Sequence, residues 1–597
     1  MKPSNELVFL SKKITSSEFI ELLDTENNTI DFEKGKYFLD KSDAIRMHYE
    51  FSNTTDSNEQ YIGLLIKNRK KLVIDGHNST FVFRGHLSPF VIDSCEDIVL
   101  KNFVIDFEPP LVAEAQVVDI GDDFIDVKID KSAFPYVVEN DWLYFDIGEE
   151  NLSPLHKHSQ IHFDTNMTVS DFSGDSFCVK CVKSIGEGKV RLFPDNPESI
   201  KCIKIGNYFV LRHNQRLHPG IFIENSQRIT LENIIVHSCG GLGILAQFSE
   251  DLTIRNVNFL PNKAKGRQIS SGRDDGIHIT SCRGTVLVEQ CSFLGLMDDP
   301  INIHGCSMKL EEVIDNGKTI RARYMHDQAK NFLYYARKGD VIHILNQKSM
   351  NVIKKAIVES FERESDDTIL LHLNDELIVF DGEYAIENVS STAEFICRNN
   401  RFGSCRARGL LISTPKKVIV EENLFESSGS AILIAGDANY WYESGECHDV
   451  TISKNVFTNR CMSSLYEFTY GIISICPVVP FPDKKYPFHK NIHIERNIFD
   501  IPDTPVLYAF STQNLIFADN RIFVSNSRKS ICEKNALINL SYCNDVTIEK
   551  NILTGLYPDE FIECEHSENI ISDRLIIKNS KRTINYDKNR VNRLFFR

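Results

Sequence analysis

The sequence lacks several features that would place it in a common class of protein. Its longest apolar runs are only a few residues long, whereas a helix across a bilayer needs about 20 predominantly apolar residues. Basic residues are the minority charge, because 67 Lys and Arg stand against 83 Asp and Glu and leave a net charge of −16. A nucleic-acid partner requires a clustered basic face, and the sequence contains none. Neither a membrane span nor a nucleic-acid partner is therefore expected.

The first residues, MKPSNELVFLSKK, lack the long apolar core of a secretory signal. Two interpretations follow from the sequence alone. Either the protein stays inside the cell, or a signal was removed before this sequence was recorded.

Closely spaced cysteine pairs are also scarce. Among 16 cysteines, only Cys178 and Cys181 have the spacing of metal ligands, and the stretch around them alternates like a strand. A zinc site needs a second pair nearby, and none follows. Most cysteines are therefore interpreted as small buried hydrophobic residues, and no metal is expected.

What the sequence does contain is an internal repeat. Its element is an alternating apolar triplet, then one or two polar residues, often Asn, and then Phe, Ile or Leu. Short strands that recur at intervals of roughly two to three dozen residues indicate a stacked solenoid, because the interval has no room for two helices. We predict an all-β, right-handed parallel β-helix. Copies of the element occupy residues 96–105, 227–236, 250–259, 284–293, 416–425, 448–457, 490–499, 513–523 and 544–553.

Two stretches interrupt the repeat. Residues 108–216 and 306–390 contain alternating segments separated by Gly and Asp turns, a pattern typical of antiparallel strands. Both are expected to be small inserted β-barrel-like domains, and insertions on a solenoid often gather on the binding face. The predicted division is 1–107 for the first rungs, 108–216 for one insertion, 217–305 for rungs with the candidate site, 306–390 for the second insertion, and 391–597 for the last rungs.

A second strand follows the first in each repeat, as a small residue and then two apolar residues at alternate positions. Its copies align at residues 241–246, 274–279, 298–303, 407–412, 429–434, 469–474 and 504–509. Parallel rungs stack about 4.8 Å apart. Asp274 and Asp275 should therefore lie beside Asp298 and Asp299, on adjacent rungs.

Four carboxylates on neighbouring rungs repel one another, and folding does not require them there. Strand parity would point Asp275 and Asp299 into the core at a prohibitive cost, so we expect both pairs to occupy a bend. His278, Asn302 and His304 should project outward from the strands that follow. Crowding also splits carboxylate pKa values, which supplies the proton donor and the base of glycoside hydrolysis. The alternatives are a turn that simply favours Asp and a calcium site.

The loop at residues 435–445, AGDANYWYESG, is suited to sugars. Asp437, Asn439 and Glu443 can hydrogen-bond hydroxyl groups, and Trp441, one of only two tryptophans, offers a flat apolar face. An exposed Trp is costly without a partner. The alternative is a hydrophobic plug against one of the insertions. Nearby, Arg408 is expected to hold one aspartate ionised.

Four stretches together resemble glycoside hydrolase family 110, the exo-acting α-1,3-galactosidases. They are RDDGIHITSCRG (273–284), MDDPINIHG (297–305), RARGLLIST (406–414) and ILIAGDANYWYESG (432–445), and the resemblance covers about residues 218–500. It implies removal of terminal α-1,3-linked galactose, as on blood-group B structures, with inversion and without a metal or other cofactor. It also implies export from the cell, which the missing signal leaves in doubt.

The resemblance assigns Asp298 as the general acid and implies that Asp275 and Asp299 activate the water. The residues expected to contact substrate are Asp274, His278, Asn302, His304, Arg408, Asp437, Asn439, Trp441 and Glu443. The expected partner is a galactose-terminated oligosaccharide, and the solenoid ends and insertions offer surfaces for a homodimer.

Three other functions stay open. A β-helix with Asp pairs and a His-Gly is also typical of polygalacturonases, although the net charge of −16 disfavours a polyanionic substrate. A polysaccharide lyase would need calcium and a basic residue as the base. The third alternative is a glycan-binding solenoid without catalytic activity.

Overall fold

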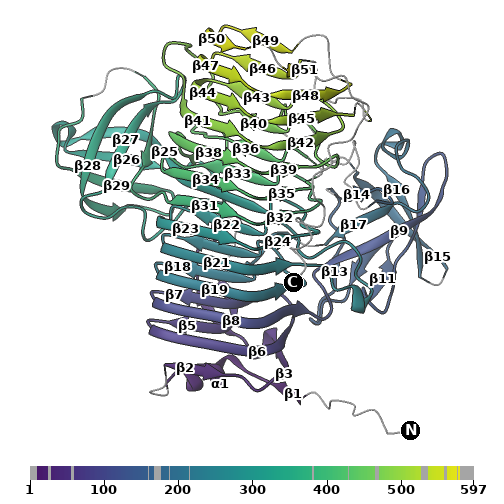
Figure 1. Cartoon of the computed structure of the whole chain (residues 1–597). Coiled ribbons are helices and arrows are strands. Elements are labelled where there is room, and N and C mark those ends of the chain that lie inside the picture. Colours follow the sequence, from purple (N-terminus) through teal and green to yellow (C-terminus); the bar gives the residue numbers. More distant parts are fainter. Residues whose placement is uncertain are drawn as a thin grey trace.

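The computed structural model describes residues 10–24, 28–54, 59–158, 160–166, 177–186, 188–213, 215–378, 382–427, 429–463, 469–525, 527, 536–556, 561–573 and 576–577. These residues form a tall stack of parallel strands with two lobes beside it (Figure 1). The stack is the predicted parallel β-helix, and the lobes are the two insertions.

Equivalent strands of successive rungs pair in parallel and form three columns, although four long strands in the first rungs run through both the first and the second column. The first column contains β6 (Lys70–Arg84), β8 (Glu96–Phe107), β19 (Gln227–Val236), β21 (Glu250–Phe259), β23 (Arg283–Glu289), β31 (Glu394–Arg398), β34 (Lys417–Glu421), β38 (Asp449–Ser453), β41 (His489–Glu495), β44 (Thr512–Ala518), β47 (Asn544–Glu549) and β50 (Glu568–Ser572). The second, short column contains β24 (Ser292–Phe293), β32 (Arg401–Phe402), β35 (Leu424–Phe425), β39 (Val456–Phe457), β42 (Ile498–Ile501), β45 (Arg521–Val524), β48 (Ile552–Gly555) and β51 (Ile576–Ile577).

The third column bears the candidate site. It contains β5 (Glu59–Lys67), β7 (Ser88–Asp93), β18 (Ile221–Glu224), β20 (Ile244–Gln247), β22 (Ile277–Thr280), β25 (Ile301–Ile314), β33 (Leu410–Ser413), β36 (Ile432–Ile434), β40 (Ile473–Ile475), β43 (Leu507–Phe510), β46 (Ile538–Ser541) and β49 (Ile562–Glu565). The Ile, Leu, Val and Phe side chains that point inward from the three columns form one continuous buried core.

The Asn and Phe residues of the sequence repeat stabilise different parts of each rung. Asn455 is fully buried at a corner, donates from Nδ2 to the carbonyl oxygen of Val420 at 2.9 Å, and accepts from the backbone N–H of Asn423. The same pattern stacks Asn400, Asn423, Asn455, Asn497, Asn520 and Asn551. The Phe residues stack inside the core, as between Phe402 and Phe425, whose ring centroids lie 4.5 Å apart. The rung at residues 394–402 has both features but was not among the copies recognised in the sequence.

The sequence predicted the register of seven rungs of the third column, and the structure confirms six of them. Ile277 pairs with Ile244 on one side and Ile301 on the other, and Ile301 pairs with Leu410. The prediction is wrong by one residue in the rung at 469–474, where Ile473 rather than Ile472 aligns with its neighbours. The backbone N–H groups of Ala431 and Ile432 both donate to the carbonyl oxygen of Ile472, so one extra residue is accommodated there.

The first insertion is a small antiparallel domain. Its larger sheet has the order β14 (Ile161–Phe163), β17 (Tyr208–Arg212), β9 (Val112–Ile120), β10 (Ile125–Lys128), β16 (Lys189–Pro194) and β15 (Val179–Gly186). A bridge between Gln160 and Phe177 connects the two edges of this sheet. A smaller sheet contains β11 (Tyr136–Glu139), β12 (Trp142–Phe145) and β13 (Ser153–Pro154). The stretch around Cys178 and Cys181 is largely strand β15, as its alternation predicted.

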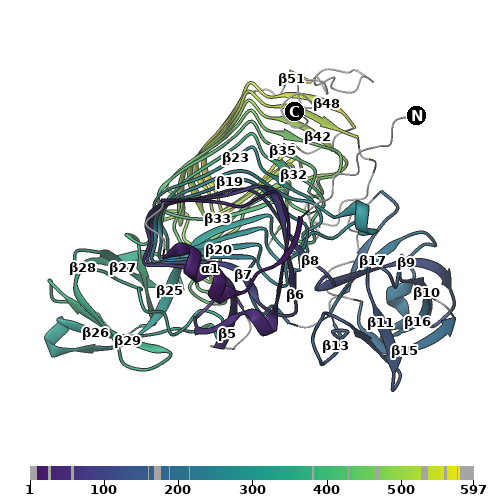
Figure 2. The ribbon, with the colours of Figure 1, turned by 90° about the horizontal axis from the view of Figure 1, so that it is seen from below.

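The second insertion closes completely. The outer half of β25 pairs with β26 (Thr319–Arg323), which continues through β29 (Thr368–Leu373), β28 (Val352–Arg363), β27 (Val341–Asn346) and β30 (Tyr384–Asn388) back to β25. This ring of six antiparallel strands is a barrel with its own apolar core. Figure 2 shows the two insertions on opposite sides of the stack. The residue boundaries drawn from the sequence for the five segments stay a prediction.

The first rung is covered by the α-helix α1 (Ser16–Leu23), which lies across the end of the stack in Figure 2. Its first turn is fixed by a capping box between Thr15 and Glu18, and Ser16 donates to the carbonyl oxygen of Gly63 at 2.6 Å. The strand β2 (Thr29–Asp31) extends the first column, β3 (Gly35–Asp40) and then β1 (Leu10–Lys13) extend the second, and β4 (Ile45–His48) pairs with β5. Within the described residues, no helix has the length and apolar character needed to cross a membrane.

Candidate active site

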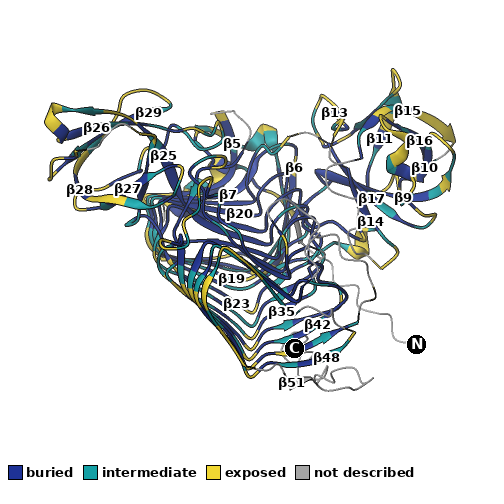
Figure 3. Cartoon of the chain, turned by 90° about the horizontal axis from the view of Figure 1, so that it is seen from above, coloured by how far each residue is buried: buried dark blue, intermediate teal, exposed yellow. Residues whose placement is uncertain are grey.

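The two Asp pairs lie where the sequence predicted, in bends directly before strands of the third column. Asp274 and Asp275 precede β22, and Asp298 and Asp299 precede β25. The backbone N–H of Gly276 donates to the carbonyl oxygen of Asp299 at 2.9 Å, which holds the two bends together. In Figure 3 the strands around β7 and β20, on the side of the stack between the two insertions, are largely buried.

Asp274 differs from the other three aspartates because arginine side chains surround its carboxylate. Its carboxylate accepts from Arg273 at 2.8 Å and from Arg216 at 3.2 Å, and Arg212 lies 3.8 Å away. Burial alone would raise the pKa of Asp274, but these guanidinium groups hold it below its ordinary range. Asp274 is therefore an ionised structural anion.

Asp299 is held by the next rung. Arg408 donates its backbone N–H to Oδ1 of Asp299 at 2.8 Å and its Nη2 to Oδ2 at 2.7 Å. Burial raises the pKa of Asp299 well above its ordinary value, and Arg408 opposes that rise. The predicted contact between Arg408 and an aspartate is present.

Asp298 is the most accessible of the other three carboxylates. Its side chain is 17% exposed, against 5% for Asp275 and 3% for Asp299. Its Oδ2 lies 3.1 Å from Arg216 and 3.3 Å from Arg406. It is therefore the carboxylate best placed to meet an atom that enters from solvent.

Asp275 heads a buried chain of polar groups. Its Oδ2 lies 2.8 Å from Nδ1 of His278, whose Nε2 lies 2.9 Å from Nε2 of His304. Glu443 follows, with Oε1 3.6 Å from Nε2 of His304. Burial and the nearby Asp298 carboxylate raise the pKa of Asp275 well above its ordinary value, whereas burial lowers the pKa of His278 to about 4.

The donor atoms of His278, His304 and Glu443 lie within 4.8 Å of one another, which raises the question of a metal. Two nitrogen ligands of a tetrahedral zinc ion, each at about 2.0–2.1 Å, would stand about 3.3 Å apart. The 2.9 Å between the two histidine nitrogens is instead a hydrogen-bond distance. The two histidines are therefore hydrogen-bonded to each other, and Glu443 lies close to His304 without a hydrogen bond to it.

The loop that carries Trp441 is organised by Asp437. This buried carboxylate accepts from four backbone N–H groups, those of Asn439, Tyr440, Trp441 and Tyr442. Burial raises the pKa of Asp437, and the four N–H groups oppose the rise.

The second insertion supports the same loop from outside. Asn439 donates to the carbonyl oxygen of Gln347 at 2.9 Å, and the ring of Trp441 lies 4.7 Å from that of His326. Trp441 remains 40% exposed, so the contact with the insertion does not cover it.

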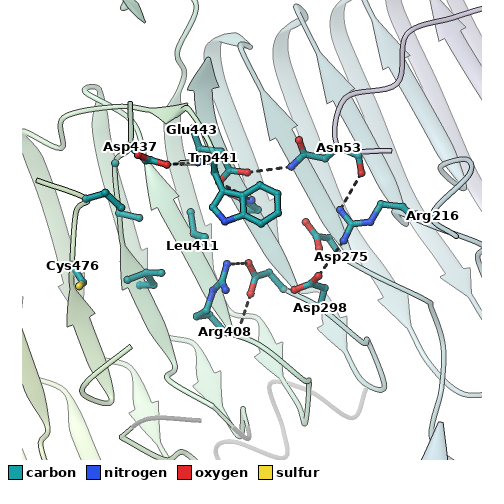
Figure 4. A pocket seen from close by; sticks show the side chains of 16 residues that line it. Asn53, Arg216, Asp275, Asp298, Arg408, Leu411, Asp437, Trp441, Glu443 and Cys476 are labelled. Atoms are coloured by element: carbon teal, nitrogen blue, oxygen red, sulfur yellow. Dashed lines mark hydrogen bonds and ion pairs between the residues drawn. The ribbon is translucent and has the colours of Figure 1, made fainter. Parts of the chain in front are cut away.

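These elements enclose a cavity (Figure 4). Its lining consists of Asn53, Arg216, Asp275, Asp298, Asp299, Asn302, Arg408, Leu411, Leu433, Ala435, Gly436, Asp437, Trp441, Glu443, Cys476 and Val478. Of the predicted site residues, eight line the cavity. Asp274, His278, His304 and Asn439 do not, and the two histidines project outward from their strands but are buried.

Eight cavity residues were not predicted from the sequence, and two of them, Arg216 and Asn53, make polar contacts with the site. Arg216 follows the first insertion, and its Nη1 donates to the carbonyl oxygen of Asn53 at 3.0 Å. Asn53 lies in the segment before β5 and donates from Nδ2 to Glu443 at 3.1 Å. Neither residue belongs to a repeat, so no alignment of rungs could have placed it.

Over most of its length the sequence is similar to curated proteins. Alpha-1,3-galactosidase B of Bacteroides thetaiotaomicron is 39% identical over 533 residues, which cover 88% of this chain and 86% of that protein. Alpha-1,3-galactosidase A of Bacteroides fragilis (strain ATCC 25285) is 30% identical, with 89% and 88% covered. The model of the GLAA-B beta-barrel domain I matches residues 113–209, within the first insertion.

Solved structures show weaker likeness. The A-module of the mannuronan C-5 epimerase AlgE6 of Azotobacter vinelandii is 8% identical, with a TM-score of 0.40 and 94% of both chains covered. The family 28 exopolygalacturonase of Yersinia enterocolitica is 9% identical, with a TM-score of 0.35 and 93% and 75% covered. At these TM-scores the likeness does not bear on function.

A β-helix with crowded carboxylates beneath an exposed tryptophan defines a hydrolase that acts on glycans. The extent of the similarity to the curated relatives makes the assignment narrower: the chain belongs to the family of alpha-1,3-galactosidases.

Proposed function

We propose that this protein is an exo-acting, inverting glycoside hydrolase that removes terminal α-1,3-linked galactose from glycans such as the blood-group B antigen. The observation that carries the proposal is the group of Asp275, Asp298 and Asp299, which share one cavity on two adjacent rungs. The proposed substrate class, α-1,3-galactosides, is taken from the names of the relatives given above.

The proposed roles follow the accessibility of the three carboxylates. Asp298, the most exposed, donates a proton to the oxygen of the leaving group. Asp275 and Asp299 both face the attacking water and Asp275 takes its proton, because a buried carboxylate with a raised pKa is a stronger base once it is ionised. The glycosidic bond breaks as the bond to water forms on the opposite face, which inverts the anomeric carbon.

The cavity offers one apolar and one polar side to a sugar ring. Leu411 and Leu433 project outward from adjacent rungs at the register position of Asn302, and Trp441 adds an aromatic face. Asn302 and Glu443 supply hydrogen-bonding groups. We propose that these residues, together with Asp437 and Arg408, hold the terminal galactose.

A polygalacturonate substrate is disfavoured by the same contacts. A uronate carboxylate would need a cation, but each guanidinium around the cavity already meets a carboxylate: Arg216 and Arg406 contact Asp298, and Arg408 contacts Asp299. The cavity also contains Asp437 and Glu443, which repel an anion.

The direct test is Asp298→Asn. The variant should lose turnover of an α-1,3-galactoside by at least about 10³-fold, because the leaving group is no longer protonated, while galactose still binds in calorimetry. Asp519→Asn, at an exposed corner of a distant rung, is the matched control and should match the parent. Normal turnover by Asp298→Asn would refute the acid role, and binding without turnover in the parent would favour a binding module.

A further inference from the structure

His278 and His304 do not line the cavity, and the roles proposed above do not use them. Both are buried, with 0% and 5% of their surface exposed. They form a continuous chain: Asp275 Oδ2 to His278 Nδ1 at 2.8 Å, His278 Nε2 to His304 Nε2 at 2.9 Å, and His304 Nδ1 to the carbonyl oxygen of Gly305 at 2.6 Å.

The hydrogen-bond partners determine how many protons Asp275, His278 and His304 hold together. The carbonyl oxygen of Gly305 can only accept, so Nδ1 of His304 carries hydrogen and, in a neutral ring, its Nε2 does not. The 2.9 Å contact then requires that Nε2 of His278 be the donor. A neutral His278 ring with hydrogen on Nε2 has a bare Nδ1, which can only accept a hydrogen bond from Asp275.

Every contact of the chain is therefore satisfied only when it holds one proton more than an ionised Asp275 and two neutral rings would supply. The extra proton lies either on Asp275 or on His278, and its transfer between Oδ2 and Nδ1 leaves all other contacts intact. Without it, two bare nitrogens would face each other at 2.9 Å, or Nδ1 of one ring would face an accepting oxygen.

We propose that His278 and His304 form a proton relay that strengthens Asp275 as the base of the hydrolytic reaction, an inference that rests on the proposed function. In the reacting form of the enzyme, the chain lacks the extra proton and Asp298 is protonated. A lone pair of the attacking water forms the new bond to the anomeric carbon, the O–H bond breaks with its electron pair left on oxygen, and the proton enters the chain at Asp275. The glycosidic electron pair leaves with the departing oxygen, which takes the proton of Asp298. Solvent later carries one proton from the chain back to Asp298.

Some charged groups around the hydrogen-bonded chain favour a proton on it, and others oppose one. Arg216 opposes a proton at Asp275 and His278, whereas the carboxylates of Asp298 and Glu443 favour one at both residues, and Asp274 also favours one at Asp275. Glu443 and His278 are the charged or titratable groups that face His304. Once a proton has entered the chain, burial places it on the carboxyl side, because burial raises the pKa of Asp275 and lowers that of His278.

The test is the pH profile of kcat/KM for His304→Gln. A glutamine amide can donate to Nε2 of His278, so the chain is satisfied without the extra proton and Asp275 becomes a weaker base. We expect the acidic limb of the profile to move to lower pH by about one unit and the plateau to fall about tenfold. His343→Gln is the matched control, since His343 is a buried histidine that faces Glu387 in the second barrel. A plateau that falls with the acidic limb unmoved would overturn the relay.

A second measurement does not depend on activity or on the stability of a variant. Proton NMR of the parent, with ¹⁵N-labelled histidine, should show a strongly deshielded N–H proton from the contact between the two rings. Its absence would overturn the relay. Zinc-dependent turnover that a chelator abolishes would also overturn it, because the two nitrogens would then bind a metal. A parent that shows this proton but releases no galactose would refute the proposed function and leave the hydrogen-bonded chain in place.

Discussion

Asp299 and Arg408 are joined across adjacent rungs by two hydrogen bonds, one from the backbone N–H of Arg408 at 2.8 Å and one from its Nη2 at 2.7 Å. The register of β25 against β33 fixes both residues. Because the stacking of the two rungs places Arg408 beside Asp299, it also influences whether this buried carboxylate is ionised.

Arg408→Gln should therefore reduce kcat/KM by about 10²-fold at neutral pH. Burial already raises the pKa of Asp299, and loss of the guanidinium raises it further, so Asp299 becomes protonated and cannot act as a base. The acidic limb of the pH profile should move to higher pH. Arg401→Gln, whose guanidinium pairs with Glu426 in the second column, is the control, and an unmoved limb in Arg408→Gln would contradict the account.

Asp437→Asn should weaken galactose binding about tenfold through the loop rather than through a lost catalytic group. The amide presents an N–H where the carboxylate accepts four, so the turn that carries Trp441 loses part of its support. In a Trp142→Phe background, Trp441 is the single tryptophan and its fluorescence reports galactose binding. An unchanged titration in Asp437→Asn would show that the turn holds without its carboxylate.

Asp274→Asn should destabilise the protein by about 3–5 kcal/mol at neutral pH, because it leaves a group of buried guanidinium ions without their anion. The pKa of Asp274 is lower in the folded state, so its stabilisation is present above the unfolded value and is lost as the pH falls through the folded one. The gap between the denaturation midpoints of parent and variant should therefore narrow below about pH 4. A gap independent of pH would contradict an ionised Asp274.

Asn455→Ala should cost about 2–4 kcal/mol, since it leaves the carbonyl oxygen of Val420 and the N–H of Asn423 buried and unpaired. The comparison is Asn514→Gly at an exposed corner, where Nδ2 donates to the side chain of Asn491 and the backbone has a positive φ that glycine tolerates. That variant should change stability by less than about 0.5 kcal/mol. Similar midpoints of chemical denaturation for the two variants would refute a structural role for the buried ladder.

The parts of the fold that repeat could be predicted from the sequence. The stacking of Asp275 on Asp299 followed from the alternation of Ile residues and the fixed spacing of parallel rungs. Where one residue is added without changing the pattern, as at Ile472 and Ile473, the periodicity could not locate the shift.

Long-range contacts outside the repeat could not be predicted. Arg216 and Asn53 enter the cavity from segments without periodicity. Glu114 of the first insertion accepts from the backbone N–H groups of Gln268, Ile269 and Ser270, just before the first Asp pair. The sequence contains no local signal for this contact, because it depends on how the insertion packs against the stack.

The central claim is best tested by proton NMR of the protein mixed with branched blood-group B trisaccharide and, separately, with linear Galα1-3Gal. The account predicts that β-galactose appears first, because water attacks the face opposite the leaving group, and that mutarotation to the α-anomer follows. First appearance of α-galactose would contradict inversion. No release of galactose from either substrate would contradict the proposed function.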